Sequence, residues 1–78
     1  MKISAEQMYE MSVLKMFDLS STQLGIKVHH EADTEMIDAT RRLFEKGLVT
    51  QVDGGYLTGL GRDAAEHVDS LITILTTA

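Results

Sequence analysis

The sequence contains no cysteine, proline or tryptophan, and aromatic residues make up only 5% of its 78 residues. The lack of cysteine excludes both disulfide bonds and thiolate metal sites as sources of stability. The longest late uncharged run is SLITILTTA, far shorter than the ~20 apolar residues that a membrane-spanning helix needs. The first residues carry charges too early for a signal peptide, whose apolar core takes roughly 7–15 residues. We therefore expect a cytoplasmic protein.

Positive charge is also scarce. Seven lysines and arginines stand against twelve aspartates and glutamates, which gives a formal net charge of -5. This surplus of acid opposes strong non-specific attraction to nucleic acid or to anionic membranes. The length allows a single domain, residues 1–78, whose core is small enough that association with another chain would add needed burial.

The first part of the chain predicts a helix followed by an ambiguous stretch. Ser4 and Gln7 form a capping box, and Met8, Met11, Leu14 and Phe17 follow at helical spacing, so we expect a helix over residues 5–17 with Glu10 facing water. Residues 18–32 allow two interpretations. One is a short turn of helix stopped by Gly25 and followed by a strand, and the other is a full second helix weakened by that glycine.

The remainder has clearer boundaries. Asp33 is the expected cap of a helix that ends at Gly47, since glycine suits the position after a helix end. Residues 48–52 are strand-like, Asp53-Gly54-Gly55 is the expected hairpin turn, and Tyr56-Leu57 begins the return strand. Thr58 is the expected cap of a last helix. Its apolar positions are Leu60, Ala64, Val68, Leu71 and Leu75.

The predicted class is therefore mainly α with a small β-hairpin (α+β), in the order α, short turn or strand, α, β, β, α. This order, together with GLV after the middle helix and GGYLTGLGRDAAEH at the start of the last one, resembles the winged helix-turn-helix superfamily. More narrowly, the chain resembles a family of short uncharacterised bacterial proteins proposed to bind DNA. The resemblance implies a DNA-binding or transcription-associated protein whose second helix is short or irregular.

In that superfamily the helix before the wing enters the major groove. The candidate nucleic-acid-binding residues are Lys27, His29, His30, Thr34, Arg41, Arg42 and Gln51. The charges oppose this function, because the helix begins with acids, no basic residue lies between Gly47 and Gly61, and Asp38 is spaced to pair with both arginines. The alternative is a winged-helix scaffold that serves protein–protein interaction without direct DNA contact.

No enzyme, cofactor or metal site is predicted. GGYLTGLG lacks the lysine of a phosphate-binding loop, and no nucleophile has a recognisable setting. His29 and His30 are adjacent, so on a strand they point to opposite faces and cannot easily chelate one ion.

The last helix instead predicts an interface, because no charged residue follows Asp69 and its apolar residues cover more than one helical face. We expect a homodimer joined through the first and last helices. The candidate interface residues are Met8, Met11, Leu71, Ile74 and Leu75.

Overall fold

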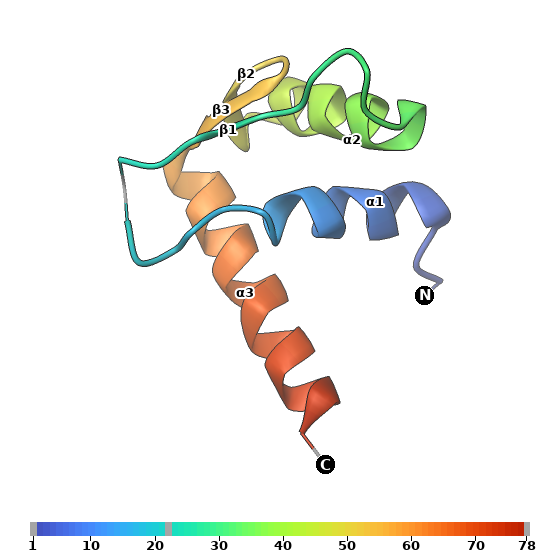
Figure 1. Ribbon diagram of the computed structural model, residues 1–78. Coiled ribbons are helices and arrows are strands. Elements are labelled where there is room, and N and C mark those ends of the chain that lie inside the picture. The colour runs from blue at the N-terminus through green and yellow to red at the C-terminus, as the bar shows by residue number, and fades with distance from the viewer. Residues whose placement is uncertain (1, 22, 78) are drawn as a thin grey trace.

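Three helices and a three-stranded antiparallel sheet make up the computed structural model, which describes residues 2–21 and 23–77 (Figure 1). The elements follow in the order α1 (Ala5–Leu14), β1 (Ile26–Lys27), α2 (Thr34–Glu45), β2 (Val49–Gln51), β3 (Gly54–Leu57) and α3 (Gly59–Thr76). The α+β class and this order agree with the sequence prediction. None of the helices in the described ranges is both long and apolar enough to cross a membrane.

Helix α1 starts as its capping box predicts and ends earlier than expected. Gln7 donates its backbone N–H to Ser4 Oγ at 3.0 Å, and the Gln7 side chain accepts the N–H of Ser4 at 2.9 Å. After Leu14 the backbone tightens, since the N–H groups of Met16 and Phe17 bond to carbonyls three residues earlier. The helix therefore stops before residue 17, although Phe17 is buried.

Between α1 and α2 the described residues contain no helix, so the prediction of a second helix, full or shortened, is wrong. Local side-chain bonds occupy the backbone instead. Asp18 accepts both the N–H and the hydroxyl of Ser20, at 2.9 and 2.6 Å. Arg62 of α3 donates to the carbonyls of Leu19 and Ser21 at 3.0 and 3.2 Å. These bonds fix a turn against α3, and the strand β1 follows.

Helix α2 has the predicted limits. It begins after Asp33, although the Asp33 side chain makes no capping hydrogen bond. At its end Gly47 has φ of 81°, and the N–H of Leu48 bonds to the carbonyl of Leu43 at 2.9 Å. This arrangement is a Schellman motif, which needs a residue with positive φ and so explains the glycine.

The sheet has the strand order β1-β3-β2. The turn lies at residues 52–53, so the prediction that Asp53-Gly54-Gly55 forms the turn is right for Asp53 and wrong for the two glycines, which belong to β3. They have φ of 122° and 72° at a point where the β2–β3 register shifts. A Cβ on Gly54 would lie 2.9 Å from the side chain of Ile26. The glycines thus permit a bulge and a close approach of β1.

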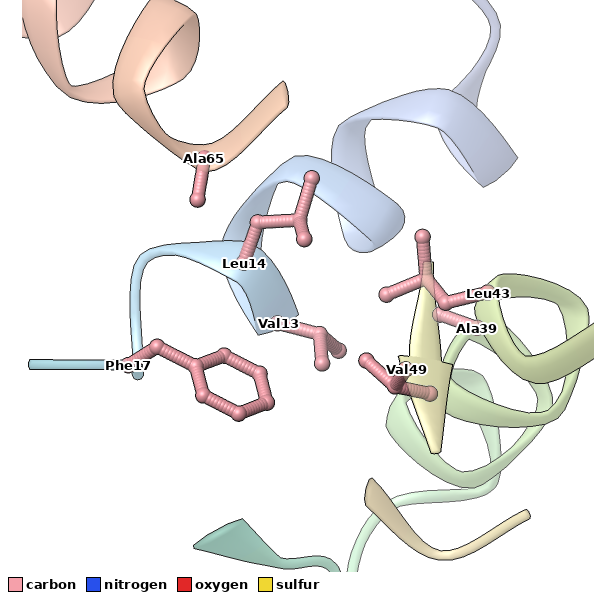
Figure 2. Close-up of a cluster of buried hydrophobic side chains, with 7 residues drawn as sticks. All are labelled: Val13, Leu14, Phe17, Ala39, Leu43, Val49 and Ala65. Carbon is pink, nitrogen blue, oxygen red and sulfur yellow. The ribbon is translucent and has the colours of Figure 1, made fainter. Parts of the chain in front are cut away.

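The core lies where α1, α2, β2 and the first half of α3 meet (Figure 2). Its buried members are Val13, Leu14, Phe17, Ala39, Leu43, Val49 and Ala65. The predicted apolar face of α1 is partly wrong. Met8 is 59% exposed, whereas Glu10, expected in water, is buried. The inward face of α1 is centred on Glu10, Val13 and Leu14.

Only the first half of α3 packs closely on the body of the domain. Gly61 and Ala65 are buried there, and a Cβ on Gly61 would collide with the carbonyl of Leu48. Lys15, at the end of α1, bonds to Asp69 at 2.8 Å. Beyond this point α3 extends away from the body, and its second half diverges from the N-terminal half of α1 (Figure 1).

Candidate interaction surfaces

Some of the predicted nucleic-acid-binding residues line a single hollow between β1 and α2. This β1–α2 groove has a volume of about 300 Å³. Its lining residues are Lys27, Val28, His30, Ile37, Thr40, Arg41, Val52 and Asp53. Three of the seven candidate residues, Lys27, His30 and Arg41, therefore share one groove between β1, α2 and the hairpin turn.

The charged side chains in and around the β1–α2 groove are of both signs. The Arg41 guanidinium lies 3.2 Å from the carboxylate of Asp38, as the spacing predicts. His30 Nε2 lies 3.9 Å from Glu31, and Asp53 lies on the groove itself. The groove therefore presents mixed charge rather than a basic surface.

The other four candidates lie elsewhere. Thr34 is the first residue of α2, and Gln51 is exposed at the end of β2. His29 lines a separate hollow of about 490 Å³ together with Glu31 and Asp33. Among the described residues, no three His, Asp or Glu side chains form a group that could hold a metal ion.

Arg42 belongs to an ion cluster between α1 and α2. Its Nε donates to Glu10 Oε2 at 3.2 Å, and Nη2 donates to the carbonyl of Glu6 at 3.2 Å. Lys46 donates to the other carboxylate oxygen of Glu10. One buried carboxylate of α1 thus bonds to two cations, Arg42 of α2 and Lys46 at the C-cap of α2. The sequence predicted pairing of Arg42 with Asp38 instead, because spacing along one helix says nothing about how a second helix crosses it.

A second groove is mainly apolar and lies between α1 and α3. Its volume is about 390 Å³. The residues that line this α1–α3 groove are Ile3, Gln7, Glu10, Met11, Leu14, Leu43, Lys46, Leu48, Ala64 and Val68. Its two charged members, Glu10 and Lys46, are bonded to each other. The lining of the groove therefore favours binding of a neutral, apolar group.

The apolar wall of this groove continues along α3 onto uncovered surface. Ala64 and Val68 line the groove, and Leu71 and Leu75 follow on the same helical face, at spacings of four, three and four residues. Leu71 is 46% exposed and Leu75 is 73% exposed. We name these four residues the α3 stripe. Half of it lines the groove, and half has no cover in the described part of the chain.

The predicted interface residues divide over different faces. Met11 lines the α1–α3 groove, and Leu71 and Leu75 belong to the α3 stripe. Ile74 is 69% exposed on a neighbouring face of α3. Met8 lies in another shallow hollow on α1 with Ala5, Tyr9 and Ser12. The sequence did not predict the groove itself, since it depends on the angle between α1 and α3.

Comparison with known proteins identifies a family. No curated protein and no solved structure matches the chain. Residues 1–76 match a family described as "Family of unknown function (DUF5669)". This match spans nearly all of the sequence, and the chain therefore belongs to the DUF5669 family.

Proposed function

We propose that this domain is a protein–protein interaction module that works through its α1–α3 face, without direct contact to DNA. The observation that carries this proposal is the α3 stripe. Its first half lines an apolar groove, and its second half, Leu71 and Leu75, extends uncovered beyond the body of the domain. Continuous apolar surface of this kind is typical of a protein interface.

The finer fold that we propose is a winged helix in which a loop replaces the second helix. Support comes from the strand order β1-β3-β2 and from the hairpin placed between α2 and α3. In this comparison α2 corresponds to the helix that enters the major groove in DNA-binding members. The fold alone does not imply DNA binding, because function depends on the residues of the site.

The basic side chains of the domain mostly bond within the chain. Five of the seven lysines and arginines have partners: Lys15 with Asp69, Arg41 with Asp38, Arg42 and Lys46 with Glu10, and Arg62 with two backbone carbonyls. Affinity for DNA depends on the number of phosphates that cations neutralise. Four of these five cations are already paired with a carboxylate, which reduces the positive charge that they offer to phosphates.

A residue-level titration tests this proposal. We expect that random duplex DNA, added at about 20 mM salt, leaves the amide resonances of residues 27–42 and 51–56 unshifted, since weak electrostatic binding is strongest at low salt. A basic DNA-binding domain of similar size serves as the positive control. Shifts confined to those residues, and lost steeply as salt rises, would overturn the proposal.

One observation favours a second candidate function, contact with DNA in a transcription-associated role. Lys27, His30 and Arg41 meet at the β1–α2 groove. Lys27 is exposed and belongs to none of the ion pairs within residues 2–21 and 23–77. If this candidate is correct, Lys27→Ala and Arg41→Ala will each reduce the shifts in the same titration and lower the salt dependence of binding.

A further inference from the structure

We infer that the occupant of the α1–α3 groove is a second copy of this chain, which inserts the second half of its own α3 and receives that of the first copy in return. This inference rests on the proposed function, because it names the partner of the same face. It assigns Met11 to the receiving groove and Leu71 and Leu75 to the inserted helix.

The first argument is the amount of exposed surface. A compact monomer of 8.6 kDa should expose about 4,700 Å², whereas this chain exposes 5449 Å². The excess of roughly 750 Å² is close to the ~800 Å² that each partner buries in an interface of standard size. The second half of α3 extends beyond the body of the domain (Figure 1), and its large apolar residues Leu71, Ile74 and Leu75 are exposed.

The second argument is self-complementarity. One chain presents an apolar groove and, beside it, an apolar helix end of matching chemistry. A two-fold axis brings the same patch of two copies together, so the helix end of each meets the groove of the other. The 4-3-4 spacing of the α3 stripe is also the spacing by which paired helices bury a shared seam.

The third argument is charge. Residues 70–77 of α3 and its C-cap carry no ionisable side chain, and the two charges in the groove neutralise each other. An acidic peptide or a nucleic acid would find no unpaired cation among the residues that line this groove. An uncharged helix end is a suitable occupant of this groove, and every copy of the chain carries such an end on α3.

Charge exchange between two variants tests the reciprocal arrangement. Leu75→Glu and Met11→Lys place opposite charges on the inserted helix and on the receiving groove. We expect each variant alone to weaken the dimer at least about tenfold, since central interface residues dominate affinity. A 1:1 mixture should restore a dimer, because the lysine introduced into one copy then meets the glutamate introduced into the other, and the second contact stays native.

A control variant and a folding check accompany the charge exchange. Met8→Lys changes α1 on a face outside the groove, and we expect it to keep the mass of the wild type. Leu75 is 73% exposed, so circular dichroism of Leu75→Glu should match that of the wild type and show that it folds.

Three results would overturn the inference. The first is a wild-type chain that stays monomeric up to about 200 µM, a concentration that would reveal even a weak dimer. The second is a wild-type dimer that neither charge variant weakens. The third is a 1:1 mixture of the two variants that stays monomeric. A monomer that also leaves DNA unbound would point to a different protein as the occupant. That result would contradict the second copy while leaving the proposed function intact.

Discussion

Arg42 Nε lies 3.2 Å from Glu10 Oε2, across the contact between α2 and α1. Because Arg42 is bonded to this carboxylate, its guanidinium is not available to a ligand. The carboxylate of Glu10 is buried and also accepts a bond from Lys46. Two cations, one in the helix that would read DNA in a winged-helix protein and one at its C-cap, therefore hold the domain together.

Replacing Glu10 by glutamine should destabilise the domain by about 1–3 kcal/mol. A fully buried pair would lose more when one partner is removed, but Arg42 and especially Lys46 retain access to water, with 22% and 53% of their side-chain surface exposed. Urea unfolding at a fixed chain concentration measures the loss. Asp38→Asn, which removes the exposed pair with Arg41, is the matched control and should cost less than about 0.5 kcal/mol. Equal losses for both variants would contradict the role assigned to Glu10.

Gly61→Ala should be far more damaging than Gly59→Ala, although both residues lie in the first turn of α3. A Cβ at position 61 collides with the backbone carbonyl of Leu48, which cannot yield as a flexible side chain could. We expect a cost of at least about 3 kcal/mol. At position 59 a Cβ meets nothing within 4 Å, so alanine should stabilise the domain by roughly 0.4–1 kcal/mol. Thermal unfolding of the two variants compares them directly, and similar melting temperatures would refute this packing of α3.

The turn after α1 gives a pH-dependent prediction. The hydroxyl of Ser20, and then its backbone N–H, bond to the Asp18 carboxylate and hold the pKa of Asp18 below its ordinary value. Because the folded pKa is lower than the unfolded one, the stabilisation is present above the unfolded pKa and is lost as pH falls through the folded pKa. Ser20→Ala should raise the pKa of Asp18 toward its ordinary value, as followed by NMR of the carboxyl carbon.

Ser21→Ala is the control for that titration. The Ser21 hydroxyl accepts the N–H of Gln23 at 3.1 Å and makes no bond to the Asp18 carboxylate. Its removal should leave the pKa of Asp18 where it is in the wild type. If Ser20→Ala also left it unchanged, the hydroxyl would not be the cause of the lowered pKa.

Local signals in the sequence were sufficient for most element boundaries. The helix-capping signals act through atoms only a few residues away. The structure confirms three of them: the capping box of Ser4 and Gln7, the helix end at Gly47 and the helix start at Thr58. The hairpin turn was misplaced because Gly54 and Gly55 could serve either a turn or a bulge. Only the neighbouring strand β1, nearly thirty residues earlier, decides between them.

The surfaces were less predictable than the elements. Glu10 was expected in water because the helical spacing of the apolar residues of α1 left it on the polar face. Its partners, Arg42 of α2 and Lys46 at the C-cap of α2, lie more than thirty residues away. The interface prediction named two methionines of α1 and three residues at the exposed end of α3. The groove beside it depends on the angle at which α1 and α3 diverge, and no local pattern encodes that angle.

Sedimentation velocity of the wild-type chain mixed with a fluorescently labelled random duplex tests the central claim most directly. At about 20 mM salt, where electrostatic binding to DNA is strongest, we predict a protein boundary with about twice the 8.6 kDa mass of one chain and a duplex boundary with the sedimentation coefficient of the duplex alone. Free protein that sediments at 8.6 kDa would contradict the second copy in the α1–α3 groove, and protein that sediments together with the duplex would contradict the absence of DNA contact.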